Sequence, residues 1–241
     1  MKRTERQHLK DNELQNLARQ ARDAYDTRRR ETTALVAVAV VVGAAAIGYI
    51  AWRERVQSKA HSLLAEAVVV QDARVGPPGA VGAPEQGLRF NTERERAEAA
   101  VAKLKSVADA YPSSDAGLYA RYQEAATWIT LGDPAKAAAA YQQVIDRDSS
   151  GIYGQMAKLG LAEAQTRSGQ YDSAIRLFQD MSQRKEGPLP VDGILMQLAR
   201  AYIDAGKKTE AQQTLNRVVS EFPTSPFSED AKKTLENLKK T

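Results

Sequence analysis

Residues 168–178, SGQYDSAIRLF, contain the pattern that organises most of this chain. Gly169 is followed by a small residue, Ala174, and then by a bulky one, Phe178. The same frame occurs 37 residues earlier as Gly132, Ala137, Tyr141 and 37 residues later as Gly206, Ala211, Leu215. Because a repeat of roughly 20–50 residues indicates stacked supersecondary units, this period decides the fold.

Further positions keep the same spacing and show how each unit is built. Four series recur every 37 residues: Ala125, Ala162, Ala199; Ala100, Ala137, Ala174, Ala211; Leu104, Tyr141, Phe178, Leu215; and Val107, Val144, Met181, Val218. Small residues at matching places in two helices let the helix axes approach closely, and the bulky residues fill the groove beside that contact. The glycine ends the first helix, because the left-handed conformation favoured there costs energy for a residue with a side chain.

Proline and serine mark the connection between one unit and the next. Tyr-Pro-Ser-Ser around Pro112 recurs three periods later as Phe-Pro-Thr-Ser around Pro223. These prolines stop the second helix of a unit, and Ser114 and Ser225 can cap the helix that follows. Each unit is therefore predicted to be a helical hairpin, and stacked hairpins form a solenoid.

The pattern predicts an all-α domain over residues 53–241, with roughly three and a half hairpins and repeats at 92–224. A first helix at 56–75 supplies the first half of the first hairpin, because Ala67 takes the small-residue position. A capping helix at 226–240 closes the last hairpin, which a solenoid needs at its exposed end.

A segment rich in glycine and proline interrupts the first hairpin at residues 76–91. Its core, GPPGAVGAPEQG, cannot be helical. Two interpretations remain open at this stage. The segment is either a surface loop or an adaptable contact segment next to the membrane.

Residues 32–52, TTALVAVAVVVGAAAIGYIAW, are predicted to form a transmembrane helix. No charge lies between Glu31 and Arg53, and a helix of this length spans about 31 Å, the thickness of the hydrocarbon layer. Tyr49 and Trp52 fit the headgroup layer at one end. A cleaved signal peptide and a buried core helix are the alternatives. The long segment before the run disfavours the first, and apolar residues on every face disfavour the second.

Basic residues predict which side of the membrane each end occupies. Residues 1–33 carry nine Lys or Arg, whereas residues 53–74 carry four. The basic tail, 1–31, should therefore stay in the cytoplasm, and the repeat domain should lie outside. The tail is interpreted as a solvated, partly helical segment, as a small docking helix, or as a contact with anionic lipid through Arg28–Arg30.

The residues of this chain do not predict catalysis. The chain has no cysteine, and its two histidines, His8 and His61, lie on opposite sides of the apolar run. We find no sequence motif for a metal, a phosphate or a nucleophile, and no basic stretch interleaved with aromatics as nucleic-acid binding requires. We therefore expect no enzyme activity, cofactor, metal, small-molecule substrate or nucleic acid.

The first helices of the hairpins should line a concave surface that binds proteins. Tyr, Met and Arg side chains are enriched at such interfaces. The alternative is that some of these side chains only pack on the neighbouring hairpin. The candidate protein-binding residues are Tyr119, Tyr122, Ile129, Met156, Leu159, Arg167, Met196, Arg200 and Ile203. Capture of a peptide C-terminus is disfavoured, because no cluster of Lys, Asn and Arg accompanies them.

The repeat resembles the tetratricopeptide repeat. That family combines a small residue in the first helix, a turn with glycine, and alanine followed by an aromatic in the second helix. Three residues of this chain depart from the pattern: Glu124 replaces a usual leucine, and Arg121 and Lys158 replace bulky residues. The period is 37 residues instead of 34.

The whole arrangement is similar to that of membrane-anchored bacterial proteins known as ancillary SecYEG translocon subunits. It combines a basic tail, one span at 32–52 and outer helical hairpins. The resemblance implies a single-pass protein of the bacterial inner membrane with a periplasmic repeat domain. Its implied partners are SecYEG, exported chains or periplasmic chaperones. The alternative hypothesis is a structural scaffold for envelope assembly or cell-division coordination.

Overall fold

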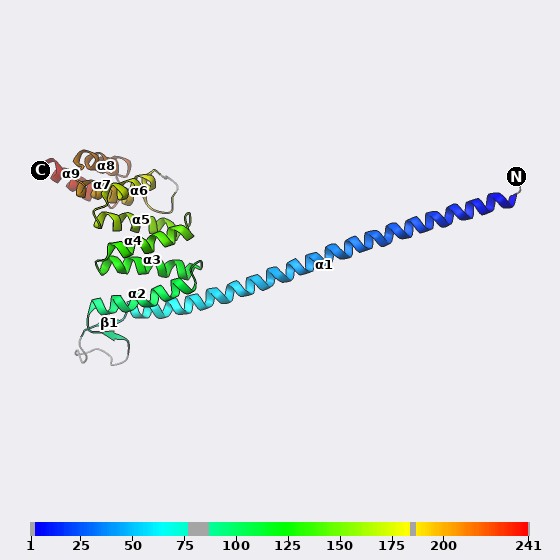
Figure 1. The fold of residues 1–241 in the computed structure, drawn as a ribbon. Helices are drawn as coiled ribbons and strands as arrows, with labels where there is room; N and C mark the ends of the chain where they lie inside the picture. Colours follow the sequence, from blue (N-terminus) through cyan, green and yellow to red (C-terminus); the bar gives the residue numbers. More distant parts are fainter. Residues whose placement is uncertain (1–2, 77–86, 184–186, 241) are drawn as a thin grey trace. The chain divides into compact units, whose positions relative to one another are not determined.

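The computed structural model describes residues 3–76, 87–183 and 187–240, and the chain divides into two units, Met1–Arg55 and Val56–Thr241. The described residues form nine helices and two short strands (Figure 1). In chain order these are α1 (Arg3–Gln71), β1 (Arg74–Val75), β2 (Arg89–Phe90), α2 (Glu93–Ala110), α3 (Asp115–Thr130), α4 (Pro134–Arg147), α5 (Ile152–Arg167), α6 (Tyr171–Ser182), α7 (Val191–Asp204), α8 (Lys208–Glu221) and α9 (Ser228–Lys240).

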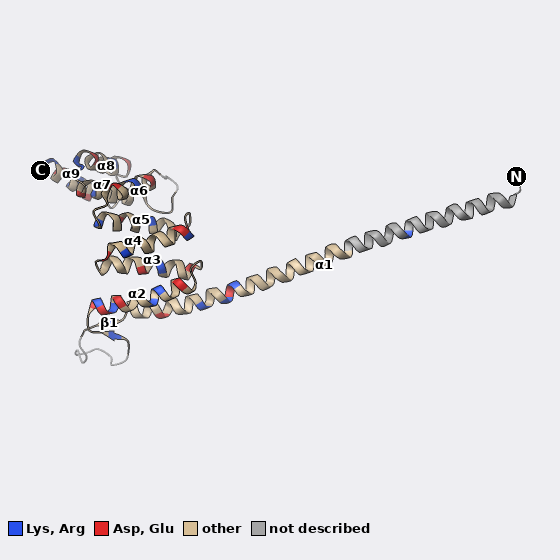
Figure 2. Cartoon of the chain, viewed as in Figure 1, with Lys and Arg blue, Asp and Glu red and all other residues tan. Residues whose placement is uncertain are grey.

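The first unit contains the part of α1 that carries the apolar run. Figure 2 shows a stretch of this helix without charged residues, and its large apolar side chains are exposed, Leu35 and Ile47 at 70%. The segment Thr33–Gln71 has a mean hydropathy of 2.5 in its most apolar window. The segment is therefore long enough and apolar enough to cross a membrane as a single helix, as the sequence predicts.

The second unit is a stack of helical hairpins in chain order, as the repeat predicts (Figure 1). The end of α1 contributes to the first hairpin, since Ala67 is buried in one cluster with Leu104 and Val107 of α2. The pairs α3/α4, α5/α6 and α7/α8 form the next three hairpins, and α9 packs against α8. The predicted all-α solenoid with a final capping helix is confirmed.

Three turns within the hairpins share one backbone geometry. Gly132, Gly169 and Gly206 have φ values of 80°, 74° and 72°, the left-handed region. The N–H group after each glycine donates to the carbonyl five residues earlier, for example from Gln170 to Gln165 at 2.8 Å. This hydrogen bond defines a Schellman motif, which explains why glycine recurs at this position.

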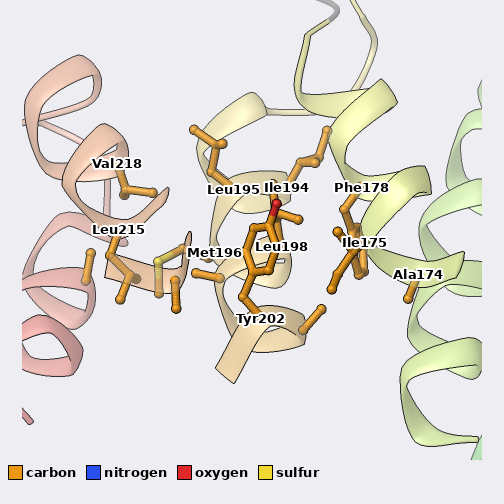
Figure 3. Packing of buried hydrophobic residues seen from close by; sticks show 14 of the residues in the cluster. Ala174, Ile175, Phe178, Ile194, Leu195, Met196, Leu198, Tyr202, Leu215 and Val218 are labelled. Atoms are coloured by element: carbon orange, nitrogen blue, oxygen red, sulfur yellow. The ribbon is translucent and has the colours of Figure 1, made fainter. Parts of the chain in front are cut away.

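The small and bulky positions of the repeat meet inside the stack, as the spacing predicts. Ala174 is completely buried, and Phe178 is among the largest fully buried side chains. Figure 3 shows Ala174 and Phe178 of α6 together with Leu195 of α7, and all three belong to one apolar cluster. Burying side chains of this size contributes about 1.5–3 kcal/mol each, so these contacts supply much of the stability of the hairpins.

One contact between hairpins requires a glycine for steric reasons. A Cβ atom added to Gly160 of α5 would lie 2.3 Å from the Tyr141 ring of α4. Tyr141 itself is buried and is the bulky member of its repeat. The backbone of α5 therefore rests directly on this ring.

The turn of the first hairpin differs from the others. Helix α1 ends at Gln71, before the expected end at 75, and β1 then pairs with β2 in parallel, with Arg74 opposite Arg89. The Ala73 carbonyl next to β1 accepts a hydrogen bond from Arg96 of α2 at 3.1 Å. This contact and the strand pair direct the chain away from the helix. Residues 77–86 of the Gly/Pro-rich segment lie outside the described residues.

Replacing Gly160 by alanine should destabilise the repeat domain by about 1–3 kcal/mol. Overpacking a buried contact costs that much, whereas the better helix propensity of alanine returns only about 1 kcal/mol. Urea unfolding of the detergent-solubilised chain, followed by circular dichroism, measures the change. In a Tyr141→Leu background the same substitution should cost less, because the ring atoms are gone. A Gly160→Ala protein as stable as the wild type would contradict the close contact.

Candidate protein-binding surface

The first helices of the last three hairpins form one continuous layer. Besides its hairpin partner, α3 contacts α5, and α5 contacts α7. We call the surface that α3, α5 and α7 present away from their hairpin partners the inner face. Its residues are the ones that the sequence predicts to be available to a protein partner.

The nine candidate residues occupy three different environments. Arg167 and Arg200 are exposed, and Met196 is buried. The other six are half-buried: Tyr119, Tyr122, Ile129, Met156, Leu159 and Ile203. Four of these six also pack against the apolar clusters, namely Tyr122, Ile129, Leu159 and Ile203. Tyr119 and Met156 are therefore half-buried without belonging to one of the apolar clusters.

Met196 has to be corrected from a surface residue to a core residue. Its side chain is only 3% exposed and lies in one cluster with Leu215 of α8 and with Ala231 and Leu235 of α9. Figure 3 shows the Met196 sulfur among the apolar side chains of α7 and α8. The capping helix α9 packs its apolar side chains into the same cluster and covers this part of α7. Met196 is therefore not available to a partner.

The two exposed arginines face carboxylates. Arg167 donates to Glu163 one turn earlier on α5, with an Nη2–Oε1 distance of 2.8 Å. Arg200 of α7 lies 3.5 Å from a carboxylate oxygen of Asp230 on α9. Exposed pairs of this kind contribute about 0–1 kcal/mol, so both arginines can exchange these partners for others.

Four tyrosines gather where α3, α4 and α5 meet. The rings of Tyr119 and Tyr153 are 6.1 Å apart, and those of Tyr122 and Tyr141 are 5.6 Å apart. Gln123 donates to the Tyr119 hydroxyl at 2.5 Å. The set brings together two candidate residues, Tyr119 and Tyr122. It also includes Tyr153. The repeat pattern missed this residue, because Tyr153 precedes Met156, the first candidate position of α5.

The phenol groups in this region sit in a negative electrostatic environment. Burial raises the pKa of Tyr122, and the nearby Glu163 carboxylate raises it further. Burial also raises the pKa of Tyr153, with smaller contributions from Asp115, Tyr119 and Asp148. Burial is the larger cause in both residues, so a phenolate is unfavourable there, and the neighbouring carboxylates add repulsion to it.

Helix α3, which carries two of these tyrosines, is held by a buried ion-pair network. Arg121 donates to Glu124 at 2.6 Å and to the Asp109 carboxylate of α2. Arg121 and Glu124 are buried, at the positions where the repeat usually has apolar residues. Lys105 and Arg121 lower the pKa of Asp109. Because the pKa of Asp109 is depressed in the folded protein, the ionised Asp109 stabilises the fold at pH values above its usual pKa of 3.8. This stabilisation is lost as the pH falls below 3.8 and through the depressed pKa.

One groove of the second unit lies elsewhere. It has a volume of about 380 Å³ beside the first hairpin turn, and none of the nine candidate residues lines it. Its lining residues are Gln71, Glu93, Arg94, Arg96, Ala97, Ala100, Thr127, Thr130 and Leu131. Within the described ranges, no group of three or more His, Cys, Asp or Glu side chains is placed to hold a metal ion.

Comparison with known proteins identifies the repeat. Residues 28–186 match the family model of a tetratricopeptide repeat-like domain, and residues 168–227 match a tetratricopeptide repeat model. No curated protein matches the chain. Similar crystal structures include a Podosopora anserina protein with nearly identical TPR-like repeats, described as a kinesin light chain, and its single-substitution variant. Both have a TM-score of 0.57 and 17% identity, and both cover 76% of this chain.

These matches cover 85% of the variant chain and 86% of the other. The crystal structure of MamA is also similar, with a TM-score of 0.46 and 15% identity over 61% of this chain and 89% of that one. At these identities the likeness to solved structures shows the fold alone.

Arg121 and Glu124 provide a test of whether the buried network can be replaced by an apolar contact. Arg121→Leu should lower the free energy of unfolding by about 3–5 kcal/mol, because the buried Glu124 loses its counter-charge and keeps only the long hydrogen bond from Trp128 Nε1 at 3.4 Å. Glu124→Leu should cost less, since Arg121 keeps Asp109. The double variant should be as stable as the wild type or more stable, by up to a few kcal/mol. Urea unfolding compares them. If the double variant shows the summed loss, the ion pairs themselves stabilise α3.

Proposed function

The chain belongs to the tetratricopeptide repeat-like family, and from this we propose that it is a non-catalytic, membrane-anchored adaptor that holds other proteins. The inner face carries the proposal: a continuous layer of first helices that presents Tyr119, Met156 and other half-buried apolar side chains. Members of this fold typically act as scaffolds for protein interactions. Half-buried tyrosine and methionine are also the residue types that interfaces favour.

We propose that residues 32–52 anchor the adaptor in a lipid bilayer. Apolar side chains on all sides of this helix are more than half exposed, and water solvates such a surface poorly. The match to the tetratricopeptide repeat-like family model begins at residue 28, so this family's domain includes the apolar run. Hydrocarbon is the environment that accommodates a helix apolar on every face.

Charge supports an orientation with the repeat domain outside the cytoplasm. Residues 56–241 contain 23 Lys or Arg and 23 Asp or Glu, so the net charge of +4 resides in residues 1–55. In Figure 2 both signs are interspersed over α2 to α9. Arg28–Arg30 precede the apolar run directly, and basic residues next to a span resist translocation. The proposed location is the bacterial inner membrane, with a periplasmic repeat domain.

The proposed partners are the SecYEG translocon and the chains or periplasmic chaperones at its outer side. The resemblance to ancillary SecYEG subunits supports this assignment, because it extends over the tail, the span and the hairpins. A structural scaffold for envelope assembly or cell division is the second candidate. The inner face is compatible with both functions. The span distinguishes them, because it contacts SecYEG in the translocon adaptor and only tethers the domain in the scaffold.

Cysteine labelling tests the orientation, because the chain contains no cysteine of its own. In spheroplasts, a membrane-impermeant maleimide should label the Ser220→Cys protein, since Ser220 is an exposed residue of α8. The Thr4→Cys protein should react only after lysis. Labelling of Thr4→Cys in intact spheroplasts, or of Ser220→Cys only after lysis, would contradict the proposed orientation.

Native capture tests the partner. The full chain with a C-terminal tag, solubilised in a mild detergent, should retain SecY, SecE and SecG in near-stoichiometric amounts, as measured by mass spectrometry. The matched control replaces residues 32–52 with an unrelated span of equal length and should lose them. Capture of a division or cell-wall protein in place of SecYEG, retained by both proteins, would reject the translocon and favour the scaffold.

A further inference from the structure

One part of the inner face combines aromatic rings with accessible apolar surface. We call Tyr119, Tyr122 and Tyr153 the tyrosine cluster. The Tyr119 ring of α3 meets Tyr153 of α5, and the Tyr122 ring of α3 meets Tyr141 of α4. Ile152 precedes Tyr153 in the chain and is 47% exposed, one of the large apolar residues of the second unit that water reaches. Tyr122 and Tyr153 pack against an apolar cluster, and all three tyrosines are half-buried, so part of each side chain remains accessible to a partner.

Three carboxylates act on the phenol groups of the tyrosine cluster. Asp115 and Asp148 act on the Tyr153 phenol, and Glu163 acts on the Tyr122 phenol. Two of these carboxylates are already engaged: Glu163 pairs with Arg167, and Asp148 accepts from the N–H groups of Gly151 and Gly154 at the start of α5. Within the described residues, Asp115 forms no ion pair. It is exposed at the first turn of α3, one turn before Tyr119.

Another part of the same hairpin shows the complete form of this arrangement. Lys136 lies over the Trp128 ring, with its Nζ atom 4.2 Å from the ring centroid. The Asp133 carboxylate holds the same ammonium group at 2.7 Å. An aromatic face, a cation and a carboxylate are thus combined at Trp128. The tyrosine cluster has the aromatic faces and the carboxylate, and among the described residues no cation lies over its rings.

We propose that the tyrosine cluster, together with Asp115, binds a lysine- or arginine-bearing extended segment of a partner protein. The cation lies against the tyrosine faces and near Asp115, while the adjoining apolar side chain of the segment covers Ile152. Cation–π attraction and an ion pair act on the same group, and each is strengthened when the partner excludes water. The inference rests on the proposed adaptor function and specifies the chemistry of its partner.

Local charge, not the charge of the whole domain, sets this preference. Residues 56–241 are balanced overall, so long-range attraction does not select a partner. An acidic segment would place a like charge against Asp115, and a neutral apolar segment would leave Asp115 desolvated without a counter-charge. Both arrangements are penalised, which gives discrimination by charge on a surface that is otherwise apolar.

Three matched fluorescent peptides test the proposal. They share one apolar and glycine-serine background and carry arginine, glutamine or glutamate at the same four positions. Fluorescence anisotropy with the full chain in detergent should give binding of the arginine peptide roughly tenfold tighter than that of the glutamine peptide. The glutamate peptide should bind still more weakly. Added salt should weaken the arginine peptide most.

Substitutions locate the site. Asp115→Asn should weaken binding of the arginine peptide about threefold to tenfold, since it removes the ion pair and keeps the side-chain size. The Tyr119→Leu, Tyr153→Leu double variant should have a similar or larger effect. Asp146→Asn on α4 is the matched control, because it removes an exposed carboxylate from a second helix and should change nothing. Asp115 is exposed, so its substitution by Asn should leave the fold intact, and a loss of binding then reports on the site.

Equal or tighter binding of the glutamine or glutamate peptide would overturn the proposal and leave the adaptor function intact. Binding of none of the three peptides would also overturn it, while native capture decides the adaptor function separately. If the detergent-solubilised chain is a dimer that the tyrosine variants convert to a monomer, a second copy occupies this face. That result overturns the partner proposed here.

Discussion

The close approach of two helix backbones at a small residue is the contact on which each hairpin depends. Ala137, Ala174 and Ala211 have no exposed surface, because the neighbouring helix lies directly against them. A larger residue would separate the helices and displace the bulky side chain one turn later. In a solenoid each hairpin contacts only its neighbours, so a displaced hairpin also loses the surface it shares with the next one. The inner face exists only because this contact is repeated with the same geometry.

The second hairpin departs from this apolar scheme and places charge inside the stack. Arg121 is held between Glu124 and Asp109, and therefore its planar guanidinium fixes α3 against α2 in one rotation. An apolar contact of similar volume would stabilise the pair as well but would define the rotation less strictly. Helix α3 carries Tyr119 and Tyr122, so the network that departs from the repeat pattern also orients part of the proposed binding surface.

The sequence predicted the features that depend on local spacing and missed those that depend on distant contacts. The turns at Gly132, Gly169 and Gly206 follow from glycine at one place in each repeat, and all three have the expected left-handed φ. Met196 occupies a regular surface position of its helix, and only the packing of the last core shows that it is buried. The pairing of β1 with β2 likewise joins the two ends of the Gly/Pro-rich segment, which no periodic pattern indicates.

The proposed membrane anchor accounts for why the proposed binding surface can be weak. Half-buried side chains such as Tyr119 and Met156 leave little apolar area to bury, and one cation on a tyrosine contributes only about 0.5–1 kcal/mol at an exposed site. Such a surface binds weakly and releases quickly. A tether to the membrane where partner chains appear raises their effective concentration to roughly the millimolar range. Weak binding is then sufficient for occupancy, and fast release lets an adaptor pass a segment on. A soluble form of the same domain would need a tighter surface to do the same work.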